Sequence, residues 1–554
     1  MLRGCGNRVR RCKSGNSVGV WDNGLQVQQV SSLLQLKKKR KRCDILGIFS
    51  SLSLSWVRLT IIIVVHCTVQ STNALPTPVD ADISDPDYKT QDHLQPIYSS
   101  SSMEAPTVKI ISDCFVKPKF VSEEAKKPIY FSPWDLAMIS VNYIQKGLLF
   151  PRPENQNFSI TTFLEELKES LSATLTHFHP LAARLATVKQ ENPPSVVIFM
   201  NPDNSPGARF IHSAVNLTVA EILTPVDVPL IVQSFFDHHK AIDHDGHEMS
   251  LLSIQVTELT DGIFIGCSIN HMVVDGTSFW HFFNSWSEVF RSKTQNGHFI
   301  PISRPPVVER WIPPGSDPIL KLPFTHEDEY IDRPYPPLLR ERIFHLSSVS
   351  LSKLKAKVNS ECNTTKISSL QAVSAVVWRC VTRARRLPAD RETSCRMAAN
   401  NRSRLSPPLP ENYLGNCIQT VRGIATAGEL LDHGVGWAAW RLHEAVVKND
   451  DKAIREFVDS WVKSPFVYKM GRFFDGNSIQ MGSSPRFDMY GNEFGLGKGV
   501  AVLSGYANKF DGKVTLYEGR DGGGSMDLEV CMLPENMEAF ECDEEFLSVV
   551  NGVL

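Results

Sequence analysis

A histidine and an aspartate stand four positions apart in the stretch INHMVVDG, as His271 and Asp275. The stretch follows an apolar run and precedes a segment with aromatic residues at helical spacing. A histidine at the end of a strand can act as a catalytic base, bind a metal ion or pack against its neighbours. An aspartate just before a helix can cap backbone N–H groups or pair with an arginine. The spacing alone leaves these alternatives open.

The flanking segments predict the structure that positions the histidine. Residues 250–270, SLLSIQVTELTDGIFIGCSIN, predict two strands joined by a turn at 260–262. His271 therefore falls in a loop between a strand and a helix. The helix is predicted over 276–292 by an apolar face made of Phe279, Phe282, Phe283, Trp286 and Phe290.

The rest of the chain alternates strand and helix patterns. Residues 107–118 predict a strand, and the apolar spacing from Phe163 onward predicts a helix that stops at Pro180. Residues 368–387 predict a helix, and late strands are predicted between 499 and 532. We therefore expect an α/β fold.

A chain of 554 residues is too long for one hydrophobic core. We expect an N-terminal domain over 103–290, a Pro-rich and charged crossover connection over 291–345, and a C-terminal domain over 346–554. Residues 1–102 contain the basic run KKKRKR and an apolar segment that Arg58 interrupts, too short for a membrane helix of about 20 residues. We expect this part to be a disordered or untranslated extension. A membrane anchor at 45–69 is the alternative.

Charge and cysteine usage exclude several classes of protein. The net charge is −2, and residues 1–102 hold 13 Lys and Arg against 7 Asp and Glu, so the remainder is acidic and does not predict nucleic-acid binding. The 12 cysteines lack any C-x-x-C pair and indicate free thiols in a reducing compartment, so we expect a cytoplasmic protein. The segment DHHKAIDHDGHE at 237–248 lacks helical ligand spacing, and it predicts a solvated loop rather than a metal site.

As one unit, SINHMVVDGTSFWHFFNSW resembles the H-x-x-x-D signature of the BAHD family of plant acyl-CoA-dependent acyltransferases. SLSATLTHFHPLAARL, NRSRLSPPLPENYLGNC and EFGLGKG resemble further landmarks of that family, in the expected order. The resemblance covers nearly all of the chain after residue 103. It implies two similar-sized domains of the chloramphenicol-acetyltransferase-like type, with mixed sheets and a channel between them.

The resemblance also implies a mechanism. His271 would be the general base that lets a hydroxyl or amine attack an acyl-CoA thioester, with acyl-CoA as co-substrate and no bound cofactor or metal. Asp275 would be structural and pair with Arg402, with Arg404 as the second candidate. Glu493, Gly495 and Gly497 would support the site.

One signature departs from the family pattern. Glu493, Leu496 and Gly499 stand where the family has Asp, Trp and Pro, and Leu496 removes an indole donor that would help to position a substrate. This leaves open a lyase or hydrolase acting on a metabolite conjugate with the same histidine, or a catalytically silent binding protein. The expected partners are acyl-CoA and a small-molecule acceptor, without nucleic acid or membrane, and we expect a monomer.

Overall fold

The computed structural model describes residues 106–154, 157–203, 205–297, 301–333, 337–473 and 475–553. They belong to a compact unit that extends from Ser101 to Leu554. The predicted extension over 1–102 lies outside the described residues. Within the described ranges, no helix combines the length and apolar character needed to cross a bilayer.

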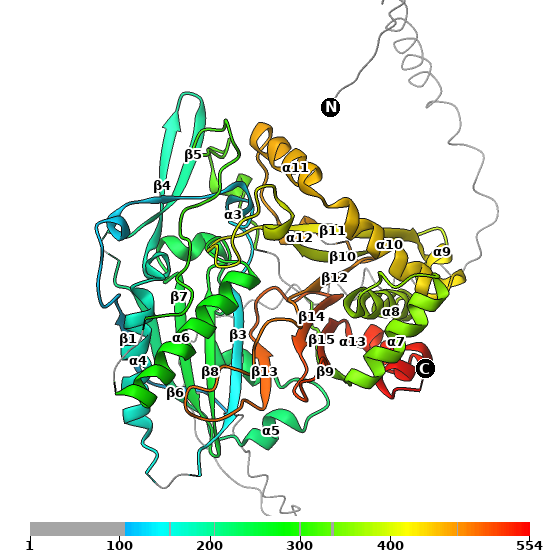
Figure 1. Cartoon of the computed structure of the whole chain (residues 1–554), viewed down its shortest axis with the longest axis horizontal. Coiled ribbons are helices and arrows are strands. Elements are labelled where there is room, and N and C mark those ends of the chain that lie inside the picture. The colour runs from blue at the N-terminus through cyan, green and yellow to red at the C-terminus, as the bar shows by residue number, and fades with distance from the viewer. Residues whose placement is uncertain are drawn as a thin grey trace, which may run out of the picture. The chain divides into compact units, whose positions relative to one another are not determined.

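The first sheet carries the histidine (Figure 1). Neighbouring strands in this sheet run antiparallel, except that β6 (Ala208–Ala214) and β7 (Leu252–Glu258) run parallel to each other. Strand β8 is fully buried and pairs with β7 through the predicted turn. The strand order is β1 (Lys109–Val116), β6 (Ala208–Ala214), β7 (Leu252–Glu258), β8 (Gly262–Ile269), β3 (Ile144–Pro151) and β13 (Ala501–Ser504).

Strand β13 joins the first sheet although it comes from the C-terminal part of the chain. It pairs with β3, and Ser504 lies opposite Lys146. The pairing buries Val502 and Leu503, and it covers an edge of β3 that would otherwise be open. The first sheet is therefore not built from residues 103–290 alone. Strand β9 (Arg340–Leu346) in turn begins within the predicted connection over 291–345.

The second sheet is also mixed. Helix α8 (Ser369–Ala384), which the sequence predicts, packs against strands β10 (Glu392–Asn400) and β12 (Ile479–Gly482). Helix α10 (Val435–Lys448) packs against strand β11 (Ile418–Thr426). A small third sheet has the order β2 (Ile129–Tyr130), β5 (Pro194–Asn201), β4 (Arg184–Glu191). The second sheet runs in the order β11 (Ile418–Thr426), β10 (Glu392–Asn400), β12 (Ile479–Gly482), β14 (Lys513–Glu518), β15 (Met526–Met532), β9.

The helices follow the strands in an α/β arrangement, as expected. Those of the first half are α3 (Pro133–Leu136), α4 (Ile160–Leu175), α5 (Val219–Leu223) and α6 (Gly276–Asn296). Those of the second half are α7 (Ser348–Glu361), α8 (Ser369–Ala384), α9 (Ala427–Asp432), α10 (Val435–Lys448), α11 (Asp451–Lys463), α12 (Met470–Phe473), α13 (Pro534–Glu541) and α14 (Glu544–Val550).

Helix α6 begins directly after the histidine turn. Its N-cap is Asp275, whose side chain accepts a hydrogen bond from the Ser278 backbone N–H. The predicted aromatic face is buried, and the helix packs on α4, where Trp286 Nε1 donates to Ser170 Oγ at 3.0 Å. This packing fixes the first turn of α6 and, with it, the loop that carries His271.

Candidate active site

His271 lies in the turn between β8 and α6, and its side chain is partly exposed. Its backbone N–H donates to Asp243 Oδ1 at 2.6 Å, and its carbonyl oxygen accepts from Asn416 Nδ2 at 2.6 Å. The peptide groups on both sides of the histidine are therefore held by side chains from distant parts of the chain. These bonds set the direction in which the imidazole leaves the backbone.

Asn416 is itself fixed by a carboxylate. Asp135 Oδ1 accepts hydrogen bonds from the Asn416 backbone N–H at 2.8 Å and from Asn416 Nδ2 at 2.9 Å. Asp135 sits in the first turn of α3, where it forms a capping box with Ser132. Both Asp135 and Asn416 are completely buried. The histidine turn thus rests on a polar network that joins α3 to the segment before β11.

Asp243 belongs to the His-rich segment 237–248, and the expectation of a solvated loop there is wrong at this position. Its side chain is completely buried, and burial raises the pKa of its carboxyl well above the ordinary value. Asn270 Nδ2 donates to the Asp243 carbonyl oxygen at 2.8 Å, so the segment is tied to the end of β8 by two bonds. No spacing rule marks this aspartate, because its partners lie 27 and 28 residues away.

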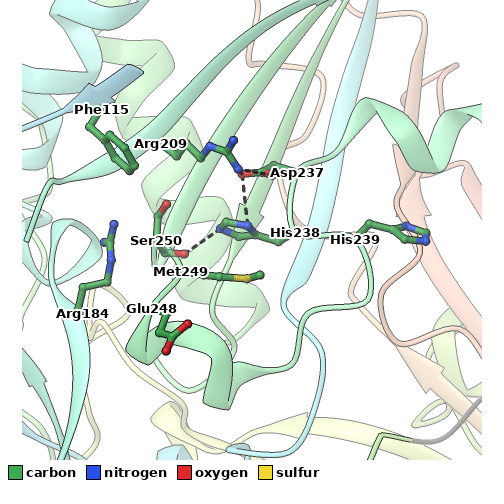
Figure 2. A pocket seen from close by; sticks show the side chains of 9 residues that line it. All are labelled: Phe115, Arg184, Arg209, Asp237, His238, His239, Glu248, Met249 and Ser250. Atoms are coloured by element: carbon green, nitrogen blue, oxygen red, sulfur yellow. Dashed lines mark hydrogen bonds and ion pairs between the residues drawn. The ribbon is translucent and has the colours of Figure 1, made fainter. Parts of the chain in front are cut away.

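The same segment contains His238, which has protein partners within a cavity. Figure 2 shows a cavity of about 320 Å³ in which Arg209 and His238 both contact Asp237, while His238 Nε2 bonds the Ser250 carbonyl oxygen. His271 is not among the residues that line this cavity. The described part of the chain contains no group of three or more His, Cys, Asp or Glu side chains that could hold a metal ion.

Asp275 forms the predicted ion pair with Arg402. Arg402 Nη1 lies 2.7 Å from Asp275 Oδ2, and Nη2 lies 3.0 Å from Oδ1, with both side chains buried. Although burial raises the pKa of Asp275, the guanidinium of Arg402 holds that pKa below its ordinary value. The carboxylate also accepts from the backbone N–H groups of Ser278 and Cys417. It anchors the chain and is not the partner that orients the imidazole.

Arg404 does not take part in this pair. Its Nη1 donates instead to the carbonyl oxygens of Val446 and Asn449, at the end of α10. Of the two candidates, Arg402 is the residue that reaches Asp275.

The EFGLGKG loop packs against α6 through Phe494. The Phe494 ring contacts Phe283, Trp286 and Phe290, with centroid distances of 5.4, 4.7 and 5.9 Å. Trp286 lies ten residues into α6, about 15 Å from the start of the helix. Gly495 and Gly497 have φ of +71° and +82°, so they provide the backbone turns that insert Phe494.

Leu496 is buried in the large hydrophobic core that contains Phe494 and that also includes Met272 and Val273, next to the histidine. The Leu496 backbone N–H donates to the Glu493 carbonyl oxygen at 2.8 Å. The support that Glu493, Gly495 and Gly497 give to the site stays a prediction, as does the effect of Leu496 on the reaction.

The electrostatic surroundings keep the imidazole neutral. Burial lowers the pKa of His271 below its ordinary value of 6.5, and the ammonium of Lys513 lowers it further. The charge of Asp275 acts in the opposite direction, but the net shift is downward. A neutral imidazole at physiological pH can accept a proton from an incoming nucleophile.

Comparisons with known proteins identify the family to which this chain belongs. The model of the Transferase family matches residues 107–547. A BAHD acyltransferase named DCR from Arabidopsis thaliana is 33% identical over 461 residues, covering 79% of this chain and 92% of the relative. The chain belongs to the BAHD family of acyltransferases.

A second relative and a solved structure agree with this membership. An uncharacterized acetyltransferase of Arabidopsis thaliana is 35% identical over 447 residues, covering 79% of this chain and 98% of the relative. The structure of F. sporotrichioides TRI101 with coenzyme A and T-2 matches with a TM-score of 0.62 at 17% identity, covering 76% of this chain and 98% of the other. The BAHD chain therefore has the chloramphenicol-acetyltransferase-like fold and is an acyltransferase.

The ion pair gives a stability prediction. Asp275→Ala leaves the Arg402 guanidinium buried without its counterion, so we expect the free energy of unfolding to fall by about 3–5 kcal/mol. Denaturant unfolding measures the change. Glu456→Ala breaks an exposed pair with Lys452 and should cost at most about 1 kcal/mol. An Asp275→Ala protein that keeps its stability but loses activity would contradict the structural role.

The EFGLGKG loop gives a second prediction. Leu496→Trp replaces a leucine side chain with a larger indole ring in a packed core. We therefore expect the free energy of unfolding to fall by about 1–3 kcal/mol, with no gain in turnover number. Thermal unfolding and steady-state kinetics on the same samples separate the two effects. A tenfold rise in turnover at unchanged stability would show that position 496 acts on the reacting groups after all.

Proposed function

We propose that His271 is the general base in the transfer of an acyl group from a CoA thioester to a hydroxyl or amine of a plant metabolite. The observation that supports this most directly is the position of the imidazole. It is partly exposed, it stands on a turn whose two peptide groups are held by Asp243 and Asn416, and its pKa is lowered.

The proposed reaction needs only this imidazole for proton transfer. The neutral ring removes the proton of the acceptor O–H or N–H as the oxygen or nitrogen attacks the thioester carbonyl. The tetrahedral intermediate collapses with cleavage of the C–S bond, and the imidazolium returns the proton to the departing thiolate. The products are the acylated acceptor and free CoA, and the histidine ends in its starting state.

The other site residues would act by position. Asp275 and Arg402 tie the start of α6 to the second half of the chain, while Asp243 and Asn416 hold the histidine backbone. The alternative of a lyase or hydrolase was motivated by Leu496. The donor panel described below distinguishes that alternative from acyl transfer.

We propose further that the protein acts as a monomer in the cytoplasm. The cysteines of the described ranges are free thiols, and five of the eight are buried, as suits a reducing compartment.

The function is tested with a donor panel. The full chain is incubated with plant extract and a set of acyl-CoA thioesters that includes acetyl-CoA, and products are followed by mass spectrometry. We expect acylated product and free CoA with the wild type, and a loss of at least about a hundredfold in His271→Ala. Ser287→Ala, on α6 away from the turn, is the control and should keep its activity. Turnover of an extract metabolite without any acyl-CoA would contradict the proposal and favour the lyase or hydrolase.

The pH dependence follows from the lowered pKa of His271. Above that pKa the imidazole is neutral and can accept a proton, whereas below it the ring is protonated and inactive. We therefore expect kcat/KM to be constant through neutral pH and to fall only on the acidic side, with a midpoint below 6.5. A pH–rate profile measures this limb, and a midpoint above 6.5 would count against a buried base.

A further inference from the structure

A cluster of buried charged side chains lies where the inner faces of the two large sheets meet. Lys146 comes from β3 of the first sheet, whereas the other members come from the second sheet and the segment that leads into it. Along β14, Val514 and Leu516 point into the second hydrophobic core, so Lys513, Thr515 and Tyr517 occupy the opposite face. The charged members are Lys146, Lys509, Lys513, Glu341 and Glu529.

Most of these groups satisfy one another. Lys509 forms an ion pair with Glu341 at 2.5 Å. Glu529 accepts from Tyr517 Oη at 2.7 Å and from Ser504 Oγ at 2.6 Å, and Lys146 Nζ donates to Tyr517 Oη at 2.8 Å. Three lysines thus face two glutamates. Burial raises the pKa of Glu341, and it also lowers the pKa of Lys146 and of Lys513. The cluster holds one basic side chain more than it holds acidic ones.

Lys513 carries that excess. Among the described residues, none accepts a hydrogen bond from its ammonium or forms an ion pair with it, yet the side chain is only partly exposed. Burial, together with the charge of Lys146, lowers the pKa of Lys513 to about 8. The space for its ammonium exists because residue 482 is glycine: a Cβ there would lie 2.2 Å from Lys513 Nζ.

The segment that follows Gly482 packs against the start of α6. Gly482 ends β12, and five residues later the Phe487 ring lies 3.3 Å from where a Cβ on Gly276 would be, at the first residue of α6. Asp275 and the His271 turn immediately precede that residue. The charge of Lys513 also contributes to the lowered pKa of the His271 imidazole.

A partly buried ammonium without a counterion is unfavourable, and the nearby Lys146 increases the repulsion. A bound anion would relieve both effects. We propose that Lys513, in the field of Lys146, forms a carboxylate-binding subsite beside His271, for a carboxylate carried either by the acceptor or by the acyl group. This proposal rests on the proposed function only in taking His271 as the reacting centre.

Binding measurements test the subsite without requiring turnover. Titration calorimetry on the full chain compares shikimate and malate with their methyl esters, and malonyl-CoA with acetyl-CoA. The first arm tests a carboxylate on the acceptor and the second arm tests one on the acyl group. The variants are Lys513→Gln, Gly482→Ala, which displaces the ammonium without removing it, and Lys357→Gln, an exposed lysine on α7 as the charge-matched control.

We expect at least one carboxylate to bind more tightly than its neutral counterpart, and Lys513→Gln to weaken that binding about ten- to a hundredfold. Gly482→Ala should weaken it as well, whereas Lys357→Gln should leave it unchanged. Binding of the neutral ligands should stay the same in all variants. The arm in which the effect is seen identifies the source of the carboxylate.

Two outcomes overturn the subsite: no carboxylate binds more tightly than its neutral partner, or Lys513→Gln binds the carboxylates as well as the wild type does. Acyl transfer is assayed separately on the same samples. A protein that binds carboxylates through Lys513 but transfers no acyl group keeps this inference and rejects the proposed function. A protein that transfers acyl groups but binds no carboxylate through Lys513 does the reverse.

Discussion

The buried ion pair between Asp275 and Arg402 is the interaction on which the rest of the site depends. It joins the N-terminus of α6 to the segment after β10, two places separated by 127 residues in the sequence. Two buried charges are tolerable only when each is the other's partner and the remaining hydrogen-bonding positions are filled. Here Ser278, Cys417 and the carbonyl oxygens of Tyr413 and Gly415 fill most of them, whereas Arg402 Nε is buried without a hydrogen-bond partner among the described residues. The ion pair thereby holds the first half of the described unit against the second half at the turn that carries the histidine.

A second constraint acts on the backbone of His271. A general base must present its imidazole in one direction, and a turn by itself would leave that direction free. Asp243 and Asn416 fix the backbone of His271, and with it the direction of the Cα–Cβ bond, by bonding the N–H and the carbonyl oxygen of the same residue. The aromatic packing of Phe494 against α6 adds rigidity from the other side. The cluster around Lys513 differs from this region, because it holds three lysines and only two glutamates.

The sequence predicted the elements near the histidine well, because their patterns are local. The aromatic spacing from Phe279 to Phe290 is a helical repeat, and the turn at 260–262 separates two apolar strands. The signature EFGLGKG was visible as well, but its position was not. A motif shows which residues occur together in a family without showing what they pack against, and only the structure placed Phe494 of this loop against α6.

By itself the sequence determined that His271 stands between a strand and a helix, that Asp275 precedes that helix, and that Arg402 is a suitable partner for it. Only the tertiary structure decided that β13 completes the first sheet, that Asp243 and Asn416 hold the histidine, and that Lys513 lies near it without a counterion. The physical reason is the distance along the chain over which each kind of interaction acts. Periodicity and capping act over a few residues, whereas the hydrogen bonds of buried polar groups are made with whichever distant segment the packing brings close.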